Sequence, residues 1–68
     1  MSTSQYQAAT NRIRAEYLEM PGMRLTVEQM QRLFGVERAV CLMLLESLVE
    51  AHFLSVYPDG TYGRDHRP

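Results

Sequence analysis

The segment Phe34-Gly35-Val36 constrains the fold of this chain more than any other, because it separates two helical patterns by a tight turn. Upstream of it, Thr26 is a predicted N-cap, and Gln29 three residues later completes a capping box. The helix that starts there is predicted to run to about Leu33, since glycine readily ends a helix in the left-handed conformation. The sequence therefore predicts two helices joined by a short turn.

The helix after this turn is predicted over about Glu37–Ala51, with one apolar face at 3.6 residues per turn. The residues of that core face are Cys41, Leu44, Leu45 and Leu48. Those that point away from it are Ala39, Leu42, Met43, Glu46 and Glu50. Glu37 should cap this helix poorly, because its arm is longer than that of Ser, Thr, Asp or Asn. His52, just past the helix, is predicted to have a positive φ.

An earlier helix is predicted over Gln5–Glu19, with Ser4 and Gln7 as its capping box and Pro21-Gly22 as its end. Its apolar residues are spaced by three and four, as one buried stripe requires. They are Tyr6, Ala9, Ile13, Tyr17 and Met20.

Two strands are predicted at the end of the chain, over about Phe53–Tyr57 and Thr61–Arg64. Between them, Pro58-Asp59-Gly60 favours a type I turn with Gly60 as a left-handed bulge, because Pro58 has no N–H to close a tighter loop. This register places Val56 opposite Tyr62, on the face toward the helices.

The 68 residues are enough for one domain, expected over 1–68 with loose tails at 1–4 and 65–68. A core of this size rarely supplies more than about 3–5 kcal/mol, so small domains often need a disulfide, a metal or a partner. Cys41, the only cysteine, falls on the buried stripe as a structural thiol, and His52 and His66 lack metal-ligand spacing. We therefore expect no metal or cofactor, but a homodimer or a protein partner.

A soluble, cytoplasmic protein is expected, because one cysteine suits a reducing compartment. The N-terminus has no basic region followed by an apolar run, so no signal peptide is predicted. The longest apolar run, 39–45, is too short to span a membrane. No nucleophile stands beside a base and no glycine-rich phosphate loop is present, so neither an enzyme nor a small-molecule site is expected.

Three helices and a hairpin, with a Phe-Gly-Val turn before the last helix, resemble the winged helix-turn-helix domains of bacterial transcription regulators. The resemblance spans about Ala9 to Arg64 and rests on apolar and glycine positions rather than on one named family. The residues that carry it are Leu33, Gly35, Val36, Cys41, Leu45, Leu48, Phe53, Leu54 and the Asp-Gly-x-Tyr sequence of the wing. It implies a mainly α fold with a small β-hairpin, and double-stranded DNA as a partner.

In DNA-binding members of this fold, the exposed side of the third helix enters the major groove. Carried onto this chain, Arg38 is the residue able to fork onto a guanine. The residues expected to contact the DNA backbone or lie close to it are Arg24, Arg32, Arg64, Arg67 and Tyr57. The formal net charge of −1 opposes this hypothesis, as do Glu46 and Glu50, which would face phosphates.

A second hypothesis is a protein-interaction or dimerisation module without DNA binding, because the same helix carries a cluster of apolar residues. The predicted interface residues are Ala39, Val40, Leu42 and Met43. DNA binding in a regulatory role is the leading hypothesis from the resemblance. Met43→Glu would dissolve the oligomer under the second hypothesis.

Overall fold

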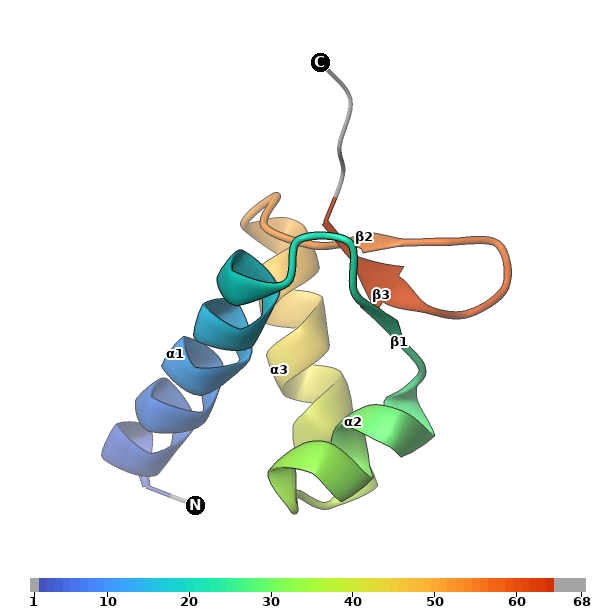
Figure 1. The fold of residues 1–68 in the computed structure, drawn as a ribbon. Coiled ribbons are helices and arrows are strands. Elements are labelled where there is room, and N and C mark those ends of the chain that lie inside the picture. Colours follow the sequence, from blue (N-terminus) through green and yellow to red (C-terminus); the bar gives the residue numbers. More distant parts are fainter. Residues whose placement is uncertain (1, 65–68) are drawn as a thin grey trace.

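A computed structural model describes residues 2–64 as a mainly α domain with a small antiparallel sheet, in a winged-helix-like arrangement (Figure 1). The elements in chain order are α1 (Thr3–Glu19), β1 (Arg24–Leu25), α2 (Val27–Phe34), α3 (Arg38–Glu50), β2 (Ser55–Val56) and β3 (Tyr62–Gly63). The predicted fold class is confirmed. The tail predicted at 65–68, together with His66 and Arg67, lies outside the described residues.

Helix α1 begins earlier than predicted, because Ser2 and not Ser4 is its N-cap. The Ser2 hydroxyl accepts the N–H of Gln5, and the Gln5 side chain accepts the N–H of Ser2. Residues 2–4, predicted as part of a loose tail, therefore form the cap and the first turn. Met20 was also assigned wrongly to the buried stripe: it is the C-cap and 57% exposed.

The predicted start of α2 is confirmed, since Thr26 and Gln29 form the reciprocal capping box. Gly35 ends the helix with φ 64, the left-handed conformation that the turn requires. Glu37 is the N-cap of α3 and makes no side-chain capping hydrogen bond, as expected. His52 has the predicted positive φ, at 60°.

The sheet contains a strand that was not predicted. β1 pairs antiparallel with β3, which also pairs with β2, so β3 is the central strand. The hairpin turn is as predicted: the N–H of Gly60 donates to the carbonyl of Tyr57, and Gly60 has φ 85. Val56 lies opposite Tyr62 as expected, although it remains 55% exposed.

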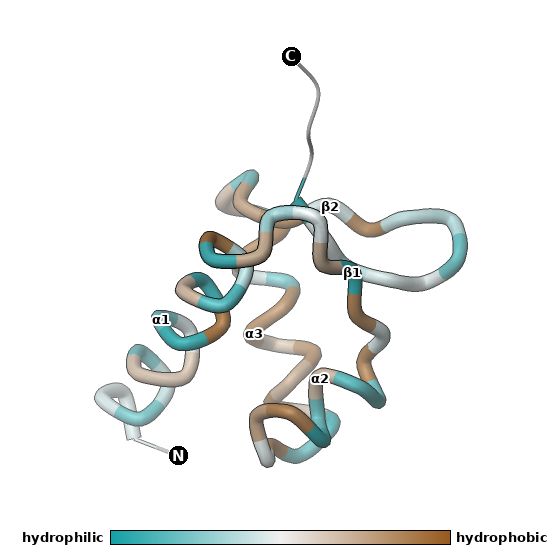
Figure 2. Tube along the Cα trace, in the orientation of Figure 1, coloured by the Kyte–Doolittle hydropathy of each residue, from teal (hydrophilic) through white to brown (hydrophobic). Residues whose placement is uncertain are grey.

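Helix α3 is the central element of the core, lying between α1 on one side and α2 and the sheet on the other (Figure 1). Its predicted core residues, Cys41, Leu44, Leu45 and Leu48, are all buried. The trace is brown to tan along most of α3 and teal over much of α1, as expected for a central and a peripheral helix (Figure 2). From α1, Ile13 and Tyr17 are fully buried against this core.

Candidate interaction surface

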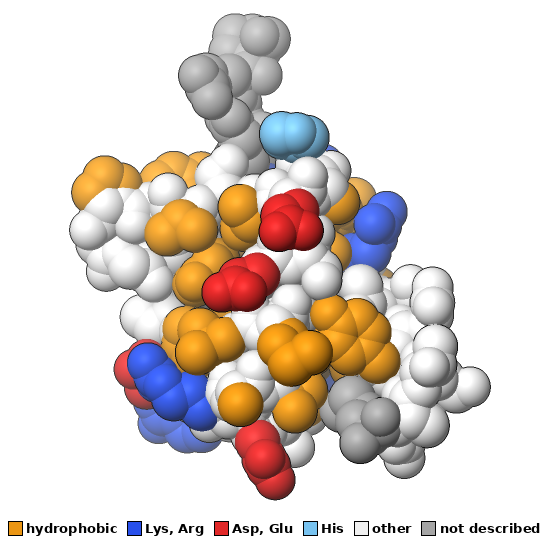
Figure 3. All heavy atoms as spheres, turned by 180° about the vertical axis from the view of Figure 1, so that it is seen from behind, with side chains coloured by type: hydrophobic (Ala, Val, Ile, Leu, Met, Phe, Trp, Pro, Cys, Tyr) orange, Lys and Arg blue, Asp and Glu red, His pale blue; other side chains and the backbone are white. Residues whose placement is uncertain are grey.

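The outward side of α3 carries two apolar residues in its N-terminal half and two acidic residues in its C-terminal half. Ala39, Met43, Glu46 and Glu50 are exposed, and Met43 leaves 56% of its surface open to solvent. Their spacing of three and four places them on one stripe opposite the core residues. We call these four residues the α3 stripe. Seen from behind, hydrophobic side chains gather on this side of the molecule, with acidic side chains above and below them (Figure 3).

The predicted interface is only partly exposed. Ala39 and Met43 are open to solvent, whereas Val40 and Leu42 are half-buried and pack against the core. Leu42, predicted to point away from the core, is therefore corrected to a boundary position. The Tyr6 hydroxyl, from α1, lies 2.9 Å from the Ser47 Oγ and donates to the Met43 carbonyl at 3.4 Å. Helix α1 thus covers one flank of α3 and leaves the Met43 side chain exposed.

Arg38, the predicted base-reading residue, forms an ion pair within the domain. Its Nη1 lies 3.4 Å from the Oε1 of Glu28, in the first turn of α2. The pKa of Glu28 lies below its usual value, first because of a backbone N–H at the start of α2 and then because of Arg38. Both side chains remain exposed, at 58% and 62%.

Arg24 is bound to the wing rather than free. Its Nη2 donates to both carboxylate oxygens of Asp59 at 3.1 Å, and its Nε donates to the Thr61 hydroxyl. The guanidinium lies 3.8 Å from the centre of the Tyr57 ring. Hydrogen bonds from Thr61, followed by the charge of Arg24, lower the pKa of Asp59. Asp59 at the tip of the hairpin is therefore held by Arg24 of β1.

The remaining predicted phosphate contacts differ from one another. Arg64 donates to the carbonyl of Phe53 at 2.8 Å and stacks over its ring, and its own carbonyl accepts the Tyr57 hydroxyl. Arg32, by contrast, is the one arginine within residues 2–64 that has no ion pair, hydrogen bond or ring contact. It lines a shallow hollow with Leu25, Gln29 and Leu33. The structure thus brings Arg24, Tyr57 and Arg64 together, and it places Arg38 and Arg32 elsewhere.

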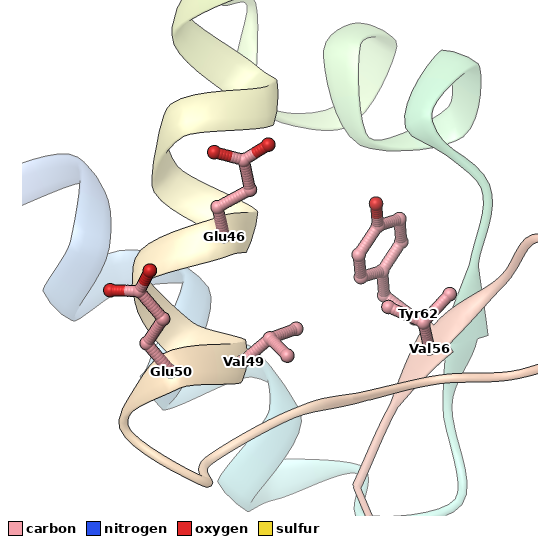
Figure 4. Close-up of a pocket in the computed structure, with 5 residues that line it drawn as sticks. All are labelled: Glu46, Val49, Glu50, Val56 and Tyr62. Carbon is pink, nitrogen blue, oxygen red and sulfur yellow. The ribbon is translucent and has the colours of Figure 1, made fainter.

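A groove between α3 and the wing was not predicted. Its lining residues are Glu46, Val49, Glu50, Val56 and Tyr62, and its volume is about 170 Å³. Val49 points from α3 toward Val56 and Tyr62 of the hairpin (Figure 4). The predicted pairing of Val56 with Tyr62, on the face toward the helices, was the sequence signal for this groove.

Other features of the described residues that bear on function are the Cys41 thiol, the placement of His, Cys, Asp and Glu side chains, and the length of the helices. Cys41 is buried with its Sγ 4.0 Å from the Val27 carbonyl, and burial raises the pKa of its thiol, so it is a poor nucleophile. Within residues 2–64, no three His, Cys, Asp or Glu side chains are placed to hold a metal ion. None of the helices in this part of the chain is long and apolar enough to cross a membrane.

No protein-family model, curated protein or solved structure matches this chain. The case for a function therefore depends on the geometry and charge of the α3 stripe, the wing and the groove between them.

Proposed function

We propose that this domain is a protein-interaction module that forms a homodimer through the α3 stripe. The observation that carries the proposal is the exposed Met43 beside Ala39 on the helix that would otherwise read DNA. A methionine on an open helix face is a flexible apolar contact suited to another protein surface. A small domain also gains most from a partner, since its own core stabilises it by only about 3–5 kcal/mol.

The charges around the stripe favour a protein over a nucleic acid. Glu46 and Glu50 would approach phosphates with the wrong sign, and Arg38, the one arginine of α3, is paired with Glu28. Affinity for DNA comes largely from phosphates neutralised by Lys and Arg. A helix that presents two carboxylates and one engaged arginine supplies little of that affinity.

A two-fold arrangement gives the stripe residue Glu46 a favourable contact. Antiparallel packing of α3 on α3 of a second copy, centred near Met43, places Glu46 of each copy opposite Ala39 of the other. Ala39 lies in the first turn of α3, where Glu37 makes no side-chain capping hydrogen bond. The backbone N–H groups of this turn have no side-chain cap from Glu37 and lie at the positive end of the helix dipole, which Glu46 of the second copy would face. The contact is self-complementary, as a two-fold dimer requires.

Sedimentation equilibrium of the wild type, Met43→Glu and Leu18→Glu tests this proposal. Leu18 is a matched control because it is 59% exposed on α1, outside the stripe. The wild type and Leu18→Glu should form dimers, whereas Met43→Glu should be monomeric with an unchanged circular dichroism spectrum. A monomeric wild type at high micromolar concentration, or equal dimerisation of all three proteins, would refute the proposal.

DNA binding in a regulatory role is the second candidate, favoured by the winged-helix-like arrangement and by Arg38. The Arg38–Glu28 pair is exposed and 3.4 Å long. Such surface pairs contribute only about 0–1 kcal/mol, so a phosphate or a guanine can replace the carboxylate. Arg32, without a partner within residues 2–64, could add a phosphate contact.

Fluorescence anisotropy of mixed-sequence duplex DNA, at low and then high salt, tests this candidate. Binding that falls steeply with salt and weakens in Arg38→Ala would make the domain a DNA binder. Absence of binding at low salt, where nonspecific attraction is strongest, would remove the candidate and leave the homodimer.

A further inference from the structure

We propose that the groove between α3 and the wing binds an arginine or lysine side chain presented by a different protein. This goes beyond the homodimer, since the groove opens on the wing side of α3, where Val49, Val56 and Tyr62 lie outside the α3 stripe and Glu46 and Glu50 belong to both surfaces. It would make the domain an adaptor with two contact surfaces.

The shape of the groove fits one long side chain. Its volume of about 170 Å³ is below the roughly 300–1,000 Å³ of small-molecule sites. Its apolar walls are Val49 from α3 and Val56 and Tyr62 from the hairpin, which face each other across the opening (Figure 4). Val56 is 55% exposed although its position opposite Tyr62 turns it toward α3, so the wall is open to an incoming group.

The charge of the groove selects a cation. Glu46 and Glu50 line it, and neither carboxylate has an ion pair or hydrogen bond among residues 2–64. They stand one turn apart, where like charges repel. Glu50 also lies in the last turn of α3, where the helix dipole disfavours anions and no basic residue is present. Like-charge repulsion and the helix dipole thus disfavour these carboxylates in the free domain, and a docked cation would relieve both effects.

Arginine and lysine match this combination of walls and charge. Their methylene stems pack on apolar surface while the charged head stays at a polar rim. The Tyr62 ring offers a face for a cation, and its hydroxyl has no hydrogen-bond partner within the described residues. A phosphate would meet two carboxylates instead, so the same groove disfavours the DNA backbone.

The test is an NMR titration of the full chain that follows the methyl signals of Val49 and Val56 and the ring signals of Tyr62. The probe is the peptide acetyl-Leu-Arg-Leu-amide, and its matched control contains citrulline, a neutral isostere of arginine. The arginine peptide should shift these signals saturably. It should bind about tenfold more tightly than the citrulline peptide, because the neutral citrulline side chain cannot form a charged hydrogen bond with the carboxylates. A peptide with lysine in place of the arginine should shift the same signals and bind like the arginine peptide.

Variants locate the interaction. Glu46→Gln/Glu50→Gln should abolish the difference between the arginine and citrulline peptides, whereas Glu19→Gln, an exposed carboxylate on α1, should preserve it. Titration of Met43→Glu separates the two proposals, because it retains every groove residue. Peptide binding by a monomeric protein would support the groove alone, and dimerisation without peptide binding would support the stripe alone.

Three results would overturn the groove proposal: no shift at these signals, equal shifts with the citrulline peptide, or unchanged selectivity in the double variant. A dilution series of Met43→Glu alone comes first, because this variant is expected to be monomeric and retains every groove residue. Concentration-dependent shifts of the same signals in this variant, lost when Glu46→Gln/Glu50→Gln is added, would mean that a second copy occupies the groove, which would also overturn the proposal.

Discussion

The buried hydroxyl of Tyr17 should make the domain unfold in alkali. Tyr17 is fully buried, and its hydroxyl donates to the carbonyl of Tyr62 at 2.7 Å, which ties α1 to the central strand. Burial, and to a lesser degree the charge of Cys41, raises its pKa from 10.0 to about 12. In the unfolded chain the phenol recovers an ordinary pKa of about 10.

The sign of the effect follows from which state loses its proton first. Between pH 10 and 12 the unfolded chain releases the Tyr17 proton while the folded domain keeps it, so the free energy of unfolding falls as pH rises. The contribution is intact below pH 10. Each unit by which the pKa differs between the two states is worth about 1.36 kcal/mol, so the full loss is on the order of 3 kcal/mol. That is most of the roughly 3–5 kcal/mol that a core of this size supplies.

Urea unfolding followed by circular dichroism, at intervals from pH 8 to 12, measures this effect in the wild type and in Tyr17→Phe. At neutral pH the variant should be less stable by about 1 kcal/mol, because it lacks the hydrogen bond to Tyr62. Above pH 10 the free energy of unfolding should fall less steeply in the variant than in the wild type. The two slopes should differ by about 1.4 kcal/mol per pH unit. Cys41, whose pKa burial also raises, contributes a fall of the same sign in both proteins, so the difference reports Tyr17 together with its interaction with Cys41. Parallel curves for the two proteins above pH 10 would refute the reasoning.

Two further predictions concern the backbone. His52→Gly should stabilise the domain by up to about 1 kcal/mol. A left-handed residue with a Cβ costs about 1–2 kcal/mol, and glycine removes this cost but gives the unfolded chain more conformational freedom, which offsets part of the gain in stability. A lower melting temperature in the variant would contradict this prediction. Gly63→Ala should destabilise it by about 1–3 kcal/mol, since the added Cβ would lie 2.8 Å from the Cγ of Arg24 and 3.0 Å from the Met23 carbonyl. Gly22→Ala is the control, because a Cβ added at Gly22 would have no atom within 4 Å. Equal melting temperatures for the two alanine variants would contradict the prediction.

Local signals explain what the sequence predicted well. The capping box at Thr26, the glycine after α2 and the Pro58-Asp59-Gly60 turn each depend on residues within a few positions of one another. The core face of α3 follows from helical periodicity alone. The same locality explains the error at α1, where Ser2–Gln5 and Ser4–Gln7 both match the capping pattern and the structure uses the earlier one.

Contacts between distant segments were beyond the reach of these patterns. β1 has two residues, and it exists because Arg24 pairs with Gly63, far along the chain. The Arg24–Asp59 ion pair depends on that same register. The groove required the positions of α3 and the wing together, although the pairing of Val56 with Tyr62 could be predicted. The Arg38–Glu28 ion pair could not be predicted either, because nothing local to α3 reveals Glu28 as the partner of Arg38.

Most of the arginines within residues 2–64 stack on aromatic side chains. Within residues 2–64, four of them lie over aromatic rings, with distances from the guanidinium carbon to the ring centre between 3.8 and 5.3 Å. The pairs are Arg12 on Phe34, Arg14 and Arg64 on Phe53, and Arg24 on Tyr57. All seven Lys and Arg positions of the sequence are arginine. A flat guanidinium stacks on a ring better than a lysine ammonium does, which gives a structural reason for arginine at the stacked positions. An arginine occupied in this way shields apolar surface at the edge of the core, so a count of basic residues overstates the charge available to a nucleic acid. Met43, Glu46 and Glu50 of α3 are exposed and take no part in these stacking contacts, and under the proposed function they are the side chains that a protein partner would meet.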